Sequence, residues 1–175
     1  RPLQSDDVVR GQAEPYRKEQ NVAADSTVET FVALRLTVDN DRWQGVPMLI
    51  RAGKYLDASV TEVQVTLKPA AWAQLAQHQP NYFRFRLSPT VEIAIGVRIK
   101  KGGEGLASEP AALHMVDETP DDGMDPYQRL LGDAIRGDTM LFAKQEFVEA
   151  AWRIVEPILA DPALLKVVQT ALQIP

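Results

Sequence analysis

Strict alternation of apolar and polar residues is the feature of this sequence that most restricts its fold. It is clearest where Val91, Ile93, Ile95, Val97 and Ile99 occupy every second position. Because successive side chains of a β-strand point to opposite faces, this period of two predicts a strand with one apolar face. An amphipathic helix would need apolar residues three and four positions apart. The segment therefore predicts a β-sheet.

Similar patterns elsewhere extend the predicted sheet to at least five strands. Residues 27–38 alternate over a long stretch, and an apolar run at 47–50 leads to Gly53. Two shorter runs also alternate, namely Val63, Val65 and Leu67, then Phe83, Phe85 and Leu87. Short connections favour antiparallel pairing, because a parallel pair needs a crossover of a dozen or more residues. We therefore predict a mainly antiparallel sheet.

Two helices are predicted in the last third of the chain. Asp125-Pro126 supplies an N-cap followed by proline at the first helical position, and Gly137 stands where a C-terminal cap would fall. A second helix is predicted over residues 144–159, where apolar residues recur at helical spacing. The members of its apolar stripe are Phe147, Ala151, Ile154 and Ile158.

Three further segments complete the predicted secondary structure. The opening stretch to Asp25 is polar and lacks periodicity, which predicts an irregular arm. Residues 70–77 contain helix formers and predict a short helix, and the tail after Pro162 predicts a third amphipathic one. The predicted class is α+β, a large mainly antiparallel β-sheet with helices packed on it.

Length and composition limit the possible classes of protein. The 175 residues, 45% of them hydrophobic, are enough for one substantial core and too few for two ordinary domains. A net charge of -5 gives no electrostatic reason to bind nucleic acid or an anionic membrane. The absence of cysteine excludes disulfides and thiol nucleophiles and fits a cytoplasmic protein. We expect a single cytoplasmic domain that binds neither nucleic acid nor membrane.

The first residues bear on the extent of the chain. Arg1 to Asp7 contain neither an initiator methionine nor the apolar segment of a signal peptide. This start predicts an N-terminus made by cutting or truncation, as in a fragment of a larger protein.

Motifs for independent catalysis are weak. The two histidines, His78 and His114, stand far apart, and no carboxylate pattern beside them suggests a metal site or a proton relay. The glycine-rich segment 102–105 does not open a helix, as a phosphate loop requires. The acidic run 117–125 lacks the spacing of a calcium loop. We predict no catalytic residue and no metal ligand in this chain.

The segment Arg51-Ala52-Gly53-Lys54 is the most informative candidate site. A glycine at a strand end lets the backbone approach a ligand, and a neighbouring cation can neutralise a phosphate. Spacing alone favours a simpler interpretation, a hairpin turn followed by a surface lysine. The residues by themselves leave both interpretations open.

Several segments occur in an order and spacing that are informative together: Arg10-Gly11-Gln12, residues 30–33, 38–47 and 49–54, Asp125 to Asp133, and Ala151 to Pro157. With these segments, the stretch from about Arg1 to Leu159 resembles the C-terminal part of glucose-6-phosphate dehydrogenase. The resemblance implies oxidation of glucose 6-phosphate to 6-phosphogluconolactone with NADP, in the pentose phosphate pathway. It also implies that residues 1–175 form the C-terminal substrate and dimerisation domain.

The same resemblance implies what this sequence lacks. In the family an N-terminal Rossmann domain holds NADP, and a histidine in an Asp-His-Tyr-Leu-Gly-Lys motif is the base. These 175 residues contain neither the glycine-rich turn of that domain nor the histidine motif. The chain alone is therefore expected to be inactive, and the residues that choose between NADP and NAD are expected outside it.

The resemblance assigns roles to two residues. Lys54 matches the family lysine that contacts the sugar phosphate, and Arg51 matches a position that touches a second, structural NADP in some members. Ser59 stands five positions after Lys54, where many members have a second basic residue, and the tail after Pro157 also departs from the family. These departures place more of the phosphate contact on Lys54 and on the N-terminal domain.

Assembly and the competing hypotheses follow from the same comparison. Family members assemble through the large sheet, so a homodimer through the sheet is expected. A second hypothesis is a noncatalytic assembly or regulatory protein with the same C-terminal fold. Ser59 and the altered tail favour it, whereas the retained segment 51–54 counts against it. An independent small enzyme or ligand carrier has no motif in its support.

Overall fold

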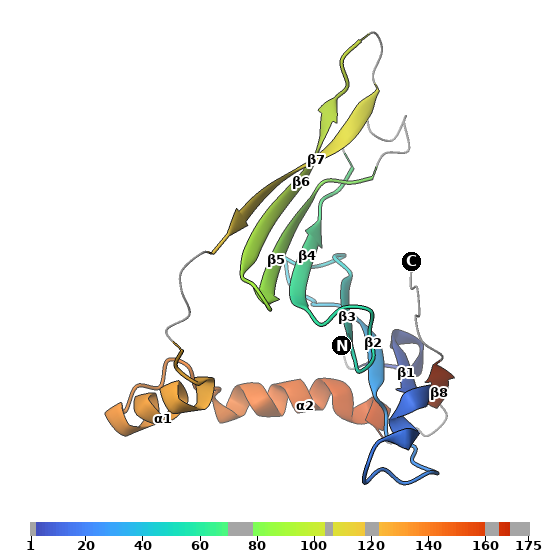
Figure 1. The fold of residues 1–175 in the computed structure, drawn as a ribbon, viewed down its shortest axis with the longest axis vertical. Coiled ribbons are helices and arrows are strands. Elements are labelled where there is room, and N and C mark those ends of the chain that lie inside the picture. The colour runs from blue at the N-terminus through green and yellow to red at the C-terminus, as the bar shows by residue number, and fades with distance from the viewer. Residues whose placement is uncertain (1–2, 70–78, 104–106, 118–122, 160–164, 169–175) are drawn as a thin grey trace. The chain divides into compact units, whose positions relative to one another are not determined.

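The computed structural model describes residues 3–69, 79–103, 107–117, 123–159 and 165–168 (Figure 1). Two short 3-10 helices, eight strands and two α-helices follow one another along these residues. In order they are η1 (Ser5–Asp7), β1 (Val8–Ala13), η2 (Glu14–Lys18), β2 (Phe31–Leu36), β3 (Met48–Gly53), β4 (Thr61–Thr66), β5 (Tyr82–Ser88), β6 (Glu92–Lys100), β7 (Ser108–Val116), α1 (Pro126–Arg136), α2 (Gln145–Leu159) and β8 (Leu165–Val168).

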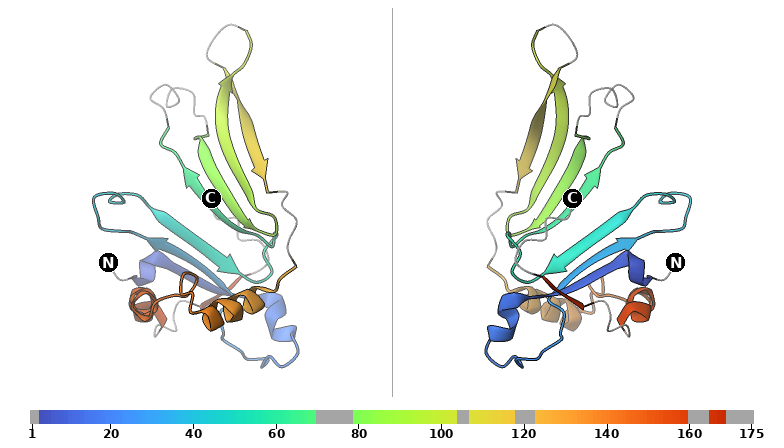
Figure 2. Two further views of the ribbon diagram at one scale, coloured as in Figure 1. Left: turned by 90° about the vertical axis from the view of Figure 1, so that its left-hand side faces the viewer. Right: turned by 90° about the vertical axis from the view of Figure 1, so that its right-hand side faces the viewer.

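The strands form two sheets, in two compact units of the chain (Figure 2). The first unit comprises Arg1–Asp57 and Asp125–Pro175, and its sheet has the order β3-β2-β1-β8. The second unit comprises Ala58–Met124, with the order β4-β5-β6-β7. The predicted α+β class and the mainly antiparallel pairing are confirmed. The strands fall into two sheets rather than one because alternation identifies strands without identifying their partners.

β1 is an internal strand of the first sheet, so the prediction of an irregular arm is wrong for this segment. It pairs antiparallel with β2, with Val8 opposite Leu34. Its polar side chains favour a surface segment in the sequence, but Arg10 and Gln12 are buried and hydrogen-bonded in the structure. Buried polar groups with partners are compatible with a sheet interior, whereas an average of polarity assigns them to the surface.

One face of the first sheet packs against α2. Leu3, Val8 and Ile158 form the buried cluster, and partly buried side chains surround it. These are Val32, Leu34, Leu36 and Val155. The face predicted from alternation in residues 27–38 therefore forms the core, although the strand itself is shorter than predicted. Leu3 also donates its backbone N–H to the carbonyl of Ile154 at 3.3 Å.

The ends of α1 follow the predicted capping chemistry. The Asp125 carboxylate accepts the N–H groups of Tyr127 and Gln128, which satisfies two donors of the first turn. Gly137 ends the helix at φ +74°, a left-handed conformation that favours glycine. The second predicted helix is confirmed as α2. Its stripe is less buried than predicted, since Phe147 is 63% exposed and Ile158 alone of the four stripe residues is buried.

The third helix predicted in the tail is wrong where the structure describes it. Residues 165–168 form β8, which pairs parallel with β1 from Arg10 to Ala13. Two consecutive valines favour an extended backbone, and pairing with the edge of β1 satisfies their peptide groups. The helix predicted at 70–77 and the middle of the acidic run at 118–122 lie outside the described residues.

The second sheet separates apolar and polar side chains onto opposite faces. Its register places Val63, Phe85, Ile93 and Met115 in one row and Val65, Phe83, Ile95 and Leu113 in the next. The predicted alternation in these strands is therefore confirmed. Most of these apolar side chains are exposed, Leu113 by 61% and Val63 by 54%. An apolar face of this extent is typical of a surface that another structure covers.

Candidate functional site

Lys54 directly follows β3, as the sequence predicts. Its backbone N–H donates to the carbonyl of Thr30 at 2.8 Å and so extends the pairing of β2 with β3. Gly53 precedes it opposite Phe31. A Cβ at Gly53 would lie 2.9 Å from Phe31 Cδ2 and 3.1 Å from the Thr30 oxygen. Glycine is needed there because the phenyl ring and the backbone occupy the space of a side chain.

A pocket of about 440 Å³ lies beside this strand end. Its walls are segments 28–32 and 52–54, with the ring of Tyr16. Lys54 and Glu29 bring opposite charges to it, and Arg10 Nη1 holds the Glu29 carboxylate at 2.6 Å. The Glu29 charge is thus neutralised by a buried arginine, while the Lys54 side chain is 59% exposed. The pocket can offer an ammonium group to an anionic ligand.

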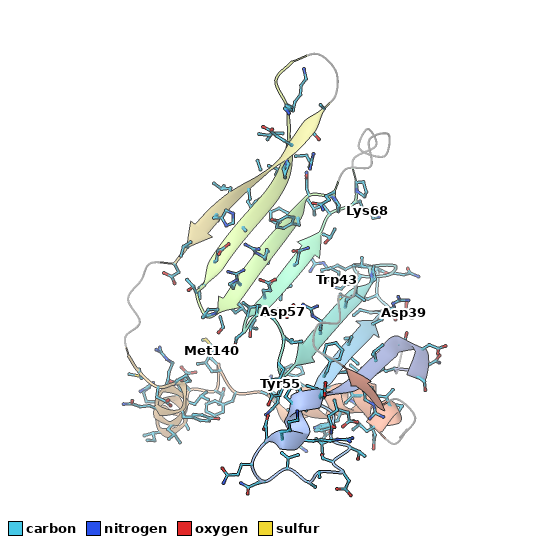
Figure 3. The ribbon with its side chains drawn as sticks, turned by 45° about the vertical axis from the view of Figure 1, so that its right-hand side comes forward. Asp39, Trp43, Tyr55, Asp57, Lys68 and Met140 are labelled. Carbon is cyan, nitrogen blue, oxygen red and sulfur yellow. The ribbon has the colours of Figure 1, made fainter. Side chains whose placement is uncertain are left out.

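Two residues lie near the ammonium group of Lys54, namely Tyr16 of η2 and Glu19, which directly follows η2. Its Nζ lies 3.7 Å from Glu19 Oε2 and 5.5 Å from the centroid of the Tyr16 ring. The next residue, Tyr55, lies beyond the end of β3 (Figure 3), and its hydroxyl donates to Glu19 Oε1 at 2.5 Å. This hydrogen bond and the charge of Glu19 raise the pKa of the Tyr55 phenol.

Arg51 lies in a different cavity from Lys54. It is paired with Ala33 across β2 and β3 and lines a hollow of about 310 Å³. Arg35 and the carboxylate residues Asp6 and Asp7 line the same hollow. With two arginines and two aspartates in its lining, the hollow has no excess of positive charge for a nucleotide with several phosphates. The residues of this hollow therefore fit a second NADP poorly.

The described ranges also contain no site that matches the other NADP, the one that accepts the hydride. No glycine-rich turn there leads from a strand straight into a helix, the geometry that holds a dinucleotide phosphate. Ser59, at the position of the family's second cation, is exposed and uncharged. No group of three or more metal-ligating side chains occurs among the residues placed in the structure. No helix in the described part of the chain is long and apolar enough to cross a membrane.

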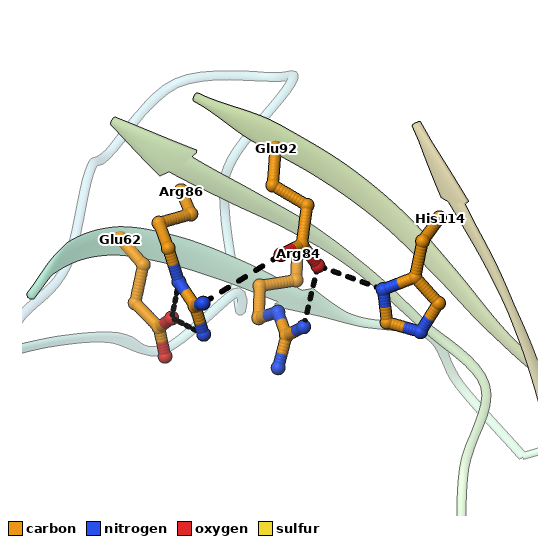
Figure 4. Close-up of polar contacts among 5 residues, drawn as sticks. All are labelled: Glu62, Arg84, Arg86, Glu92 and His114. Atoms are coloured by element: carbon orange, nitrogen blue, oxygen red, sulfur yellow. Dashed lines mark hydrogen bonds and ion pairs between the residues drawn. The ribbon is translucent and has the colours of Figure 1, made fainter. Parts of the chain in front are cut away.

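A second polar cluster lies on the polar face of the second sheet, centred on Glu92 (Figure 4). Glu92 Oε1 accepts from Arg84 Nη2 and from His114 Nδ1, each at 2.8 Å. Arg86 Nη1 lies 3.6 Å from Glu92 Oε2, and Arg86 Nε lies 3.4 Å from Glu62 Oε2. Because an ionised carboxylate only accepts, the Nδ1 of His114 must carry the hydrogen. His114 is thus part of an ion-pair network, and His78 lies outside the described residues.

This network predicts a dependence of stability on acid. The hydrogen bonds from His114 and Arg84 lower the pKa of Glu92 below its ordinary value of 4.5. A carboxyl group with a lowered folded-state pKa stabilises the fold above its unfolded pKa, and this contribution is lost as pH falls through the folded pKa. We expect the free energy of unfolding to fall more steeply below about pH 4.5 in the natural protein than in Glu92→Gln. Denaturant unfolding at a series of pH values measures this, and parallel curves would contradict it.

Comparisons with known proteins identify the family to which the chain belongs. A family model described as glucose-6-phosphate dehydrogenase, C-terminal domain, matches residues 3–169. Glucose-6-phosphate 1-dehydrogenase 1 of Mycobacterium bovis is 38% identical over 165 residues, 92% of this chain and 35% of that protein. The crystal structure of glucose-6-phosphate 1-dehydrogenase from Mycobacterium avium superposes with a TM-score of 0.81 at 34% identity, covering 97% of this chain and 37% of that one.

A further solved structure is of glucose-6-phosphate dehydrogenase in complex with its substrate glucose-6-phosphate. It has a TM-score of 0.75 at 25% identity and covers 97% of this chain and 38% of that one. The fold and these matches define the chain as a C-terminal domain of an oxidoreductase. It belongs to the family of glucose-6-phosphate dehydrogenase C-terminal domains, which confirms the resemblance. The chain spans little more than a third of the length of these relatives.

Sequence reasoning missed the partners of Lys54. Tyr16 and Glu19 come from the segment that was predicted to be irregular, and no spacing rule connects them to a lysine after β3. The family motif Arg10-Gly11-Gln12 was a usable signal. This motif lies in the segment that the structure shows as β1, directly before η2.

Proposed function

We propose that this chain is the substrate-binding and dimerisation region of a glucose-6-phosphate 1-dehydrogenase. The reaction is the oxidation of glucose 6-phosphate at C1 to 6-phosphogluconolactone, with NADP as the acceptor, in the cytoplasm. The observation that carries the proposal is Lys54 at the end of β3, beside a pocket and behind a glycine whose Cβ would not fit. Membership of the family supports the choice of sugar phosphate and cofactor.

Within this proposal, the chain's own residues bind and orient the substrate. The Lys54 ammonium holds the phosphate through a charge-assisted hydrogen bond, which fixes the sugar at its end remote from C1. Phe31 and segment 52–54 provide a rigid wall beside it. NADP supplies the hydride acceptor when it is bound by another part of the enzyme. Because the base and the acceptor site are outside these 175 residues in the proposed enzyme, the chain alone is expected to be inactive.

The sheets support the proposed assembly. We propose a homodimer that forms through a sheet face, and the exposed apolar face of β4 to β7 has the composition of a surface that becomes buried. Leu87, Leu113 and Met115 on this face are each more than half exposed. Covering such side chains removes apolar area from water, at roughly 25 cal/mol for each Å².

A second candidate is a noncatalytic assembly or regulatory protein with the same C-terminal fold. The observation in its favour is that Lys54 faces Glu19 and that Ser59 supplies no second cation. A phosphate dianion at this site would then contact a single lysine, Lys54, with the Glu19 carboxylate beside it. This candidate predicts an interface and no affinity for glucose 6-phosphate.

Replacing Lys54 with glutamine tests the proposed contact. We expect glucose 6-phosphate to bind the full-length native protein at least about tenfold more weakly, because one charge-assisted hydrogen bond to the phosphate is lost. Isothermal titration calorimetry measures this affinity. Lys18→Gln is the matched control, since Lys18 ends the neighbouring η2, is exposed and does not line the pocket. Equal affinities for Lys54→Gln and the natural protein would reject the contact.

A further inference from the structure

Glu19 contacts two consecutive residues of the turn that follows β3. Its Oε2 lies 3.7 Å from Lys54 Nζ, and its Oε1 accepts the hydroxyl of Tyr55 at 2.5 Å. Glu19 itself is held at the end of η2, where its N–H donates to the carbonyl of Tyr16 at 3.0 Å. The end of η2 thus presents a carboxylate to the turn that carries Lys54.

The backbone of this turn has an unusual conformation. Tyr55 has φ +58°, in the left-handed region that non-glycine residues seldom adopt. Such a residue persists only where its surroundings hold it, and a strained residue next to a binding group is a reason to look for a role. The Tyr55 side chain is held by its hydrogen bond to Glu19. The backbone just before Tyr55 is held by the hydrogen bond from the Lys54 N–H to the carbonyl of Thr30. The hydrogen bond from Tyr55 therefore holds the Glu19 carboxylate at the turn, next to Lys54.

The charge of Glu19 acts on the same lysine. The pair is partly exposed, with 59% exposure for the Lys54 side chain and 34% for Glu19, and its 3.7 Å separation is long. An exposed pair of this kind is weak and exchanges readily. An incoming phosphate would seek the same ammonium group, and it would be repelled by the carboxylate. Lys54 therefore cannot pair fully with the Glu19 carboxylate and with the phosphate at the same time.

We propose that Glu19 is a counter-ion of Lys54, which pairs with the ammonium group beside the pocket and yields it to the phosphate of an incoming sugar phosphate. The inference rests on the proposed function, since it assumes that Lys54 is the phosphate contact. It adds that anion affinity at this site is restrained by Glu19, the residue that directly follows η2.

The charge-neutral variant Glu19→Gln tests the counter-ion role in the full-length native protein. We expect glucose 6-phosphate to bind about fivefold more tightly at low ionic strength, because one nearby negative charge is removed. The gain should shrink at about 1 M salt, where charges are screened within a few ångström. In an assay of NADP reduction, the KM of Glu19→Gln for glucose 6-phosphate should fall with kcat unchanged. Glu146→Gln on α2 removes the same charge away from the pocket and should leave the affinity unchanged.

A second variant separates charge from the shape of the turn. Tyr55→Phe removes the hydrogen bond to Glu19 and keeps both charges. We expect its affinity for glucose 6-phosphate to stay within about twofold of the natural protein, because the charge of Glu19 is retained. Titration of the Tyr55 phenol gives a readout that does not involve substrate. In Glu19→Gln its pKa should fall toward the ordinary value, since the raised pKa has Glu19 as its main cause.

The possible outcomes distinguish this inference from the proposed function. Weaker or unchanged binding by Glu19→Gln, together with weaker binding by Lys54→Gln, would reject the counter-ion role and leave the phosphate contact in place. Natural affinity in Lys54→Gln would reject the contact and the inference with it. An unchanged Tyr55 titration in a folded Glu19→Gln protein would reject the hydrogen bond on which the inference is built.

Discussion

Replacing Phe31 with alanine is expected to destabilise the first unit by about 3–5 kcal/mol, the range for truncating a buried phenylalanine. Phe31 is 6% exposed, and its neighbours across the sheet are Gly11 on β1 and Gly53 on β3. A phenyl ring flanked by two glycines covers backbone that has no side chain of its own. Because neither glycine can fill the cavity, its collapse should be limited.

Denaturant unfolding of the natural protein and the variant measures this effect. Phe147→Ala is the matched control, since it removes the same ring from a position on α2 that is 63% exposed. The control should change the free energy of unfolding by less than about 1 kcal/mol. Similar losses in the two variants would show that the Phe31 ring is not packed as described. Because Phe31 also lines the pocket, its variant should in addition bind glucose 6-phosphate more weakly under the proposed function.

Replacing Gln12 with leucine is expected to cost about 2–4 kcal/mol, because buried hydrogen-bonding groups lose their partner. Gln12 is 2% exposed, and its Nε2 donates to the carbonyls of Ser26 and Val28 at 2.9 and 2.8 Å. Its Oε1 accepts from Arg17 Nε at 2.6 Å. The side chain therefore ties η2 and the segment before β2 to β1. A leucine of similar size would satisfy none of these groups.

The same unfolding assay measures the loss, with Gln20→Leu as the control. Gln20 lies in the same part of the chain and is exposed, so its replacement should change the stability by no more than about 0.5 kcal/mol. A Gln12→Leu protein as stable as this control would contradict the buried network. The expected loss also bears on the site, because Tyr16 and Glu19 are positioned by the segment that Gln12 anchors.

Local chemistry explains which elements were predictable. The ends of α1 depend on Asp125, Pro126 and Gly137, each of which acts on residues within one turn of itself. The strands of the second sheet follow alternation, because that sheet has one apolar and one polar face. Signals of this kind are contained in a few neighbouring residues. They are read correctly without knowledge of the rest of the fold.

Non-local pairing explains the errors. β1 contains Arg10 and Gln12, which are buried only because Glu29, Ser26 and other groups distant in sequence satisfy them. β8 is extended because it pairs with β1, far away along the chain. Neither pairing leaves a trace in the spacing of the residues themselves. The division of the strands into two sheets has the same origin.

The candidate site was predictable in part. Lys54 and Arg51 came from the family resemblance, since spacing alone favoured a turn with a surface lysine. The structure places the two residues in different cavities, which no periodicity indicates. Glu19 and Tyr16 were not predicted, because their contact with Lys54 depends on how η2 is folded against the strand end.

We propose that this chain takes part in glucose 6-phosphate oxidation as one region of a dehydrogenase. The most direct test is the glucose 6-phosphate-dependent reduction of NADP by the native protein that carries this sequence, isolated from cell extract with its intact mass determined. We expect a product far heavier than the 19.4 kDa of these residues, and we expect it to reduce NADP in the presence of glucose 6-phosphate. A native product of about that mass with no reduction of NADP would contradict it and favour the assembly protein.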